Sequence, residues 1–142
     1  MKSNIVVALV AAVSFLSLAM PVFAHHGFAV EFDAKKCADL KGTLTRVDWN
    51  NPHLYFYMEV KDASGKVTPW TFEGHALAAL QRSGTHKVTL MENIGKEVSV
   101  RACLAKNGGP RAAAETLTTP DGVSHFIGVD VEHPGAASSA PN

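Results

Sequence analysis

The stretch LKGTLTRVDWNNPHLYFYMEV, residues 40–60, carries the pattern that decides the fold. Residues 54–60 alternate between apolar and more polar side chains, which is typical of a β-strand with one buried face. Over residues 40–49 the apolar positions change phase between Leu44 and Val47, as they do at a β-bulge. Asn50-Asn51-Pro52 is a turn signal. The stretch therefore predicts a bent strand, a turn and a second, regular strand.

The same reading extends along the rest of the chain. A hairpin turn is expected at residues 62–65, a helix at about His75 to Arg82, and a further short turn at Val88 to Met91. Additional strands are expected at residues 67–72, 98–104, 112–118 and 125–129. This order predicts a mainly β fold, a small OB-like barrel of five to six strands with one short helix, in which the long bent first strand serves both sheets. An open α+β sheet is the alternative.

Residues 1–24 have the organisation of a cleavable secretory signal peptide. Lys2 precedes an apolar stretch from Ile5 to Ala19, and Pro21 and Ala24 mark a helix break and a cleavage site. The apolar stretch is shorter than the roughly 20 residues that a membrane-spanning helix needs. We therefore expect a periplasmic or secreted protein that begins at His25 and is not inserted in a membrane after cleavage. Residues 25–131 are expected to form one domain, and the Pro-, Gly-, Ala- and Ser-rich residues 132–142 a disordered tail.

Composition narrows the classes of function. The chain has 13 Lys and Arg against 13 Asp and Glu, with no basic block, which disfavours nucleic acid as a partner. It lacks the short motifs of nucleophilic hydrolases, zinc proteases, nucleotide-binding enzymes and c-type cytochromes. The sequence therefore predicts no catalytic residue and disfavours an enzyme.

Cys37 and Cys103 are the only cysteines of the chain. In an oxidising compartment such a pair favours a disulfide, whereas two independent buried thiols are the alternative. In the predicted strands, both cysteines occupy positions whose side chains point away from the barrel interior. If the first and fourth strands are neighbours, we expect a cross-strand bond on the outer surface.

The predicted mature terminus offers metal-binding chemistry. A terminal His25 has a free amine and its own ring nitrogen, and one further histidine would complete a set of three nitrogens that suits Cu(II). This arrangement resembles the histidine brace of exported copper proteins, a likeness confined to His25. The candidate metal ligands are His25, His26, His53 and His75. The alternative is a solvated start of the chain that holds no metal.

Trp49, Trp70 and Glu73 are candidate ligand-binding residues at one end of the barrel. For Trp49 we favour the competing interpretation, in which it belongs to the core next to a structural turn at residues 50–52. Glu73 could be a buried acid, a metal ligand or a carboxylate near a helix start. We favour the last of these, since a negative charge there is stabilised by the helix dipole.

Three segments resemble an uncharacterised family of small exported bacterial proteins. Residues 24–33, AHHGFAVEFD, are similar to its start A-H-H-S-F-x-x-E-F-D, and residues 42–53 to its G-x-(V/L)-x-x-(V/I)-x-W-x-N-P-H motif. Residues 70–74, WTFEG, and the turn at 121–122 continue the likeness. This chain departs from the pattern at Gly27, in its two cysteines and at residues 85–87. The resemblance implies export and a small barrel-like fold, and it implies no activity.

These observations lead to two expectations of function. The first is a non-catalytic periplasmic module that binds a small molecule or an envelope protein. The alternative is a copper-binding protein that uses His25.

Overall fold

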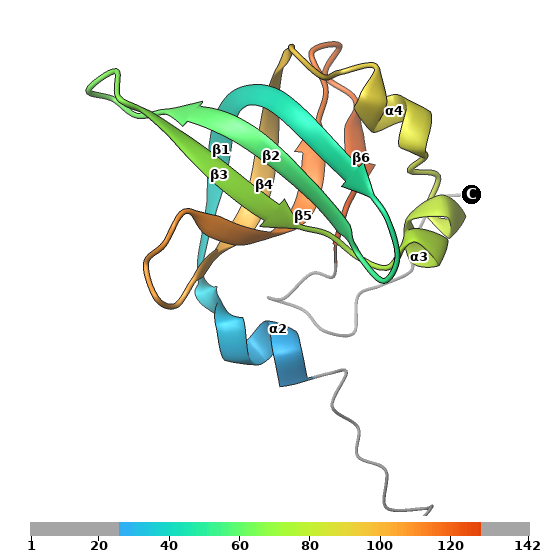
Figure 1. Ribbon diagram of the computed structural model, residues 1–142, viewed down its shortest axis with the longest axis horizontal. Helices are drawn as coiled ribbons and strands as arrows, with labels where there is room; N and C mark the ends of the chain where they lie inside the picture. Colours follow the sequence, from blue (N-terminus) through green and yellow to red (C-terminus); the bar gives the residue numbers. More distant parts are fainter. Residues whose placement is uncertain (1–25, 129–142) are drawn as a thin grey trace, which may run out of the picture.

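The computed structural model describes residues 26–128 (Figure 1). The predicted signal peptide, His25 and the predicted tail at 132–142 lie outside this range. The described part contains three short helices and six strands. In chain order they are α2 (His26–Glu31), β1 (Phe32–Trp49), β2 (Leu54–Lys61), β3 (Val67–Glu73), α3 (Leu77–Arg82), α4 (Lys87–Met91), β4 (Glu97–Ala105), β5 (Arg111–Thr118) and β6 (Ser124–Phe126).

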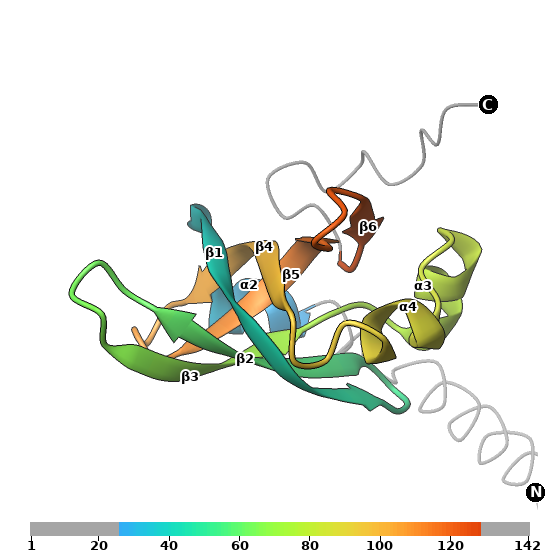
Figure 2. The same cartoon turned by 90° about the horizontal axis from the view of Figure 1, so that it is seen from above.

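Five strands close into a ring. β1 pairs antiparallel with β2 on one side and with β4 on the other, β2 pairs with β3, and β4 with β5. A short parallel pairing between β3 and β5 completes the ring, and β6 adds to β5 (Figures 1 and 2). The ring order β1-β2-β3-β5-β4 confirms the mainly β, OB-like prediction.

The long first strand makes this closure possible. Its register with β2 shifts between Leu44 and Arg46, which confirms the predicted bulge. β1 begins at Phe32, earlier than the predicted Leu40, and its first half pairs with β4 while its second half pairs with β2. One bent strand therefore belongs to both sides of the ring.

The helices differ most from the prediction. The single predicted helix corresponds to α3, and the predicted turn at 88–91 is α4. α2 was not predicted at all. Its sequence, HGFAVE, contains a glycine and a β-branched valine, both poor helix formers. The helix is associated with tertiary packing rather than with intrinsic helix propensity, since Phe28 packs against Phe32, Ala105 and Ala113.

The inward positions of the strands form the core. Leu44, Phe56, Met58 and Phe72 are fully buried, and the rings of Phe56 and Phe72 stack with centroids 5.0 Å apart. Burying side chains of this size contributes roughly 1.5–3 kcal/mol each. The sheet therefore turns its alternate, more polar positions outward, and the candidate site lies among them.

The predicted disulfide is present. Cys37 and Cys103 are register partners on β1 and β4, and they are bonded. The expected surface position was wrong for Cys103, which is fully buried. Its sulfur lies 3.5 Å from a carboxylate oxygen of Glu115 on β5, so an outward-facing position on β4 is still covered by a neighbouring side chain.

None of the helices between residues 26 and 128 has the length and apolar character needed to cross a membrane.

Candidate functional site

A polar cluster lies on the outer face of the barrel where β2, β3 and β5 meet. Glu73 is the last residue of β3 and faces outward because its neighbour Phe72 is buried inside. Tyr55 lies opposite it in the register with β2, and Arg111 begins β5 beside the end of β3. We call the set Glu31, His53, Tyr55, Glu73 and Arg111 the acid–histidine cluster.

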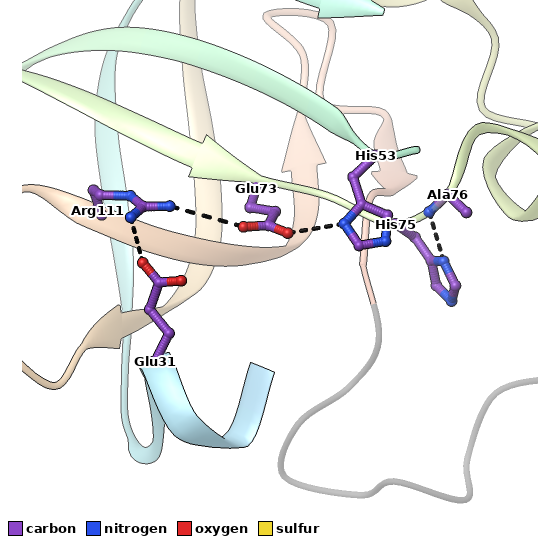
Figure 3. Close-up of polar contacts among 6 residues, drawn as sticks. All are labelled: Glu31, His53, Glu73, His75, Ala76 and Arg111. Carbon is purple, nitrogen blue, oxygen red and sulfur yellow. Dashed lines mark hydrogen bonds and ion pairs between the residues drawn. The ribbon is translucent and has the colours of Figure 1, made fainter. Parts of the chain in front are cut away.

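Glu73 is the centre of this cluster (Figure 3). One carboxylate oxygen lies 2.9 Å from Nδ1 of His53, and the other lies 3.9 Å from Nη2 of Arg111. Nη1 of Arg111 makes a short ion pair with Glu31, at the end of α2. The Glu73 side chain is only 12% exposed, so its charge is compensated mainly by these protein partners.

Backbone pairing brings His53 and His75 to the same place. The Leu54 amide donates to the carbonyl of His75 at 3.2 Å, and the Gly74 amide donates to the carbonyl of Leu54 at 2.8 Å. A side chain at Gly74 would come within 3.1 Å of the Leu54 side chain and 2.9 Å of Ile127. Glycine at position 74 therefore permits the close approach that places the two imidazoles beside each other.

The two imidazoles differ in which nitrogen keeps a free lone pair. An ionised Glu73 can only accept a hydrogen bond, so Nδ1 of His53 donates and Nε2 of the neutral ring carries the lone pair. In His75, Nδ1 accepts from the Ala76 amide at 2.7 Å, so the neutral ring carries its proton on Nε2. Only the His53 ring thus leaves its lone pair available to a ligand in this arrangement.

Burial and charge shift two pKa values at the site. The pKa of Tyr55 is raised by burial, then by the charge of Glu73 and the hydrogen bond to it, so the phenol stays neutral. The pKa of His75 is lowered by burial first, then by the charges of His53 and Arg82. Apart from His53 and the neutral Tyr55, the acid–histidine cluster holds two carboxylates, Glu31 and Glu73, and one guanidinium, that of Arg111.

The structure separates the predicted site residues. His53 and Glu73 are in contact and His75 lies beside them, whereas His26 opens α2 and His25 is outside the described residues. The interpretation of Glu73 as a helix-start carboxylate was wrong, because it ends β3 and α3 has no acidic residue in its first turn.

The two tryptophans do not join the cluster. Trp49 and Trp70 are half-buried and pack against the core, which agrees with the core interpretation of Trp49. Trp70 also lines a cleft of about 570 Å³ with Leu40, Val60 and Pro110, and neither Trp49 nor Glu73 takes part in that cleft.

Sequence reasoning missed three members of the cluster. Tyr55 could not be placed, because the turn predicted at 62–65 would pair residue 61 with residue 66 and so residue 55 with residue 72, one position from its observed partner Glu73. Arg111 could not, since the parallel pairing of β3 with β5 joins segments distant in sequence. Glu31 depends on Arg111 and on an unpredicted helix.

Among residues 26–128, one group of three side chains brings metal-ligand atoms within 4.8 Å of one another: Cys37, Cys103 and Glu115. Both sulfurs are engaged in the disulfide and are not thiolates, the form in which cysteine binds metals. This group is therefore not a metal site, and the acid–histidine cluster would need further ligands from elsewhere.

A family model described as a family of unknown function, DUF6152, matches residues 12–114, which include His53, Glu73 and Arg111. No curated protein matches the chain, and no solved structure does.

Proposed function

Because the chain belongs to DUF6152, a family of unknown function, we propose its function from the site: a non-catalytic exported protein that binds Cu(II) between His53 and the mature amino terminus. The hydrogen bond between Glu73 and Nδ1 of His53 carries this proposal. A carboxylate that holds one ring nitrogen and leaves the other free is the usual outer-shell partner of a metal-ligating histidine.

The remaining nitrogens would come from the start of the mature chain. Cleavage after Ala24 would give His25 a free amine and a ring nitrogen, and Nε2 of His53 would complete three nitrogens, a set that suits the tetragonal preference of Cu(II). His25 precedes Glu31 by six positions, a length of roughly 9 Å in helical conformation. Glu31 is itself paired with Arg111 of the cluster, so the proposal needs only this short segment to reach His53.

Two further observations support an exported cation-binding protein. The excess of carboxylate over guanidinium charge in the acid–histidine cluster favours a cation near His53. The disulfide between Cys37 and Cys103 is of the kind that persists in oxidising compartments, as expected for a periplasmic or secreted location.

The cleft beside Trp70 favours a second candidate function, the binding of a small molecule. Its volume of about 570 Å³ lies within the usual range for ligand pockets. Its lining combines apolar side chains of β1, β2 and β3 with charged ones such as those of Lys41, Lys61 and Asp62. If the protein holds no nitrogen-coordinated copper, this binding function becomes the working hypothesis.

The copper proposal is tested by titrating the mature protein with Cu(II) and recording its EPR spectrum. Mass spectrometry must first show that the purified chain starts at His25. His53→Ala is expected to remove one nitrogen ligand and to weaken Cu(II) binding by about tenfold or more. His75→Ala is the matched control and should keep the wild-type spectrum, because the His75 lone pair is already engaged by Ala76.

Binding that is unchanged in His53→Ala, or lost in His75→Ala alone, would contradict this assignment. So would a wild-type spectrum without nitrogen coupling.

A second variant tests the carboxylate. Glu73→Gln keeps a hydrogen-bond acceptor for His53 but removes the negative charge, so the imidazole becomes a weaker ligand. Cu(II) affinity, measured by competition with a chelator, should fall by about tenfold. Glu59→Gln, at an exposed position of the neighbouring strand β2, should leave it unchanged. Equal affinities in the two variants would show that Glu73 does not tune His53.

A further inference from the structure

We propose that the cleft beside Trp70 binds a planar aromatic carboxylate, with the aromatic ring stacked on the indole and the anionic group near Lys61. This inference rests on the small-molecule function proposed for the cleft and adds to it the chemical class of the ligand. It does not depend on Cu(II) binding. Every residue that lines the cleft belongs to the described part of the chain.

The cleft exists because two strand pairings stop short of the β2–β3 hairpin turn. The pairing of β1 with β2 ends at Gly42 and Val60, and the parallel pairing of β3 with β5 begins only at Thr71. The end of the hairpin therefore has no ladder pairing with β1 or β5, and it projects from the ring in Figures 1 and 2. The cleft lies between this end of the hairpin, residues 39–41 of β1 and the loop before β5.

Inward-facing strand positions form the apolar side of the cleft. Leu40, Val60 and Trp70 are partly buried and pack against the hydrophobic core. Trp70 lies two positions before the buried Phe72, on the same face of β3. Pro110 adds a further apolar surface from the loop before β5. The part of a ligand that contacts this side should therefore be uncharged, because a charge there would lose its hydration without a partner.

The indole of Trp70 is a preorganised platform for a flat ring. Its centroid lies 6.1 Å from that of Phe72, with 26° between the ring planes, and the Phe72 ring stacks on Phe56 at 5.0 Å. Phe56 and Phe72 are fully buried, whereas Trp70 lines the cleft. A row of three aromatic rings thus leads from the core to the cleft. A planar ligand can extend this row, since aromatic pairs gain from stacking beyond the area that they bury.

Most charged side chains of the cleft already have partners in the protein. Lys41 pairs with Glu97 at 2.8 Å, and Asp39 lies 3.8 Å from Arg101. Asp62 is engaged in the hairpin turn, where one carboxylate oxygen accepts hydrogen bonds from two backbone amides and a hydroxyl. These three lining residues therefore have little to gain from the charge of a ligand.

Lys61 is the charged lining residue that lacks such a partner. Its side chain is exposed, and among the residues that the structure describes its ammonium makes no hydrogen bond or ion pair. A carboxylate on the ligand would give this ammonium a charge-assisted partner, whereas a cationic ligand would meet only carboxylates that are already engaged. The cleft should therefore prefer an anion to a neutral molecule, and a neutral molecule to a cation.

The test titrates the purified protein with four probes and follows its amide signals by NMR. The probes are naphthoate, neutral naphthylmethanol, cationic naphthylmethylammonium and the saturated anion decahydronaphthoate. Naphthoate is expected to bind with a dissociation constant on the order of 1 mM, as is typical of a molecule of its size. It should bind about threefold tighter than naphthylmethanol, the effect of an exposed ion pair. It should bind about fivefold tighter than decahydronaphthoate, which has no flat ring to stack.

Two variants separate the ring from the charge. Trp70→Leu should weaken the binding of naphthoate and naphthylmethanol alike, by about fivefold. Lys61→Gln should weaken the binding of naphthoate alone, by about threefold. The matched controls, Trp49→Leu and Lys87→Gln, change residues outside the cleft and should bind all four probes like the wild type. Because Lys61 is exposed, its variant and the comparison of probes on the wild type keep the test valid if Trp70→Leu folds poorly.

The outcomes separate the ligand class from the function on which it rests. Trp70-dependent binding of the probes with no preference for naphthoate over naphthylmethanol or decahydronaphthoate would overturn the inference alone. So would a preference for naphthoate that is unchanged in Lys61→Gln. Binding of none of the four probes, or binding that is equal in Trp70→Leu and the wild type, would remove the small-molecule function of the cleft together with the inference.

Discussion

At the scale of single residues, the site depends on a carboxylate that the fold nearly buries. Glu73 would be costly in this position without partners, because removing a charge from water costs several kcal/mol. His53, Arg111 and Tyr55 compensate this cost. A polar group held by three partners from two segments of the chain, the start of β2 and the start of β5, is constrained in orientation, which is a property expected of a binding site.

His75 gives a prediction about pH. Burial, then His53 and Arg82, lower the pKa of the His75 imidazole below its ordinary value of about 6.5. The unfolded chain therefore takes up this proton at a higher pH than the folded chain does. The contribution of neutral His75 to stability should be complete above about pH 6.5 and should decrease as the pH falls through the lowered pKa.

NMR titration of the metal-free protein and urea unfolding at pH 7.5 and 5.5 test this expectation. His75→Gln should reduce the loss of stability between the two pH values, and His86→Gln, at an exposed position, is the control. An imidazole of His75 that titrates at or above pH 6.5 would contradict the prediction.

At the scale of elements, the close approach of β1 and β2 depends on a glycine, Gly42, which has no side chain to obstruct it. A Cβ at Gly42 would collide with the backbone carbonyl of Glu59, and its neighbour Val60 lies within 3.1 Å. Gly42 is the register partner of Val60 on β2 and of Val98 on β4, so it lies where β1 passes from one partner to the other. Glycine here permits a close backbone approach in the strand that serves both sides of the ring.

Gly42→Ala is therefore expected to destabilise the protein by about 2 kcal/mol or more, because the clash is with backbone and cannot be relieved by a rotamer change. The measurement is the urea midpoint of unfolding. Gly109→Ala is the matched control, since its Cβ would meet only the flexible Asn107 side chain, at 3.2 Å. Comparable losses in the two variants would show that the β1–β2 crossing is not tightly constrained.

At the scale of the whole molecule, the disulfide closes a long loop. Cys37 and Cys103 are separated by 66 positions, and a cross-link of that span stabilises by about 4 kcal/mol in the chain-entropy treatment. The bond joins β1 to β4, next to Glu115 of β5. It therefore restrains the side of the ring opposite the hairpin of β2 and β3.

Cys37→Ala/Cys103→Ala should lower the free energy of unfolding by about 4 kcal/mol without changing the fold. Urea unfolding of the double variant, with circular dichroism of the native state, measures both. Reduction of the wild-type protein should cause a similar loss. A loss below about 1 kcal/mol would show that the unfolded chain gains little freedom when the bond is absent.

Much of the architecture could be predicted from sequence because it depends on local pattern. The alternation over residues 54–60 predicted β2, the change of phase after Leu44 predicted the bulge, and the two cysteines predicted their bond. Each is a property of neighbouring positions or of a pair with few alternatives. The order of these elements was enough to indicate an OB-like ring.

The candidate site depended on tertiary structure. The sequence by itself determined that His53 and Glu73 end or begin regular elements, and it offered no reason to pair them. Closure of the ring through β3 and β5 brought Arg111 beside Glu73, and packing rather than propensity formed α2 and placed Glu31 on that arginine. Periodicity specifies which face of an element is buried, whereas contacts between distant segments arise only when the whole chain has closed.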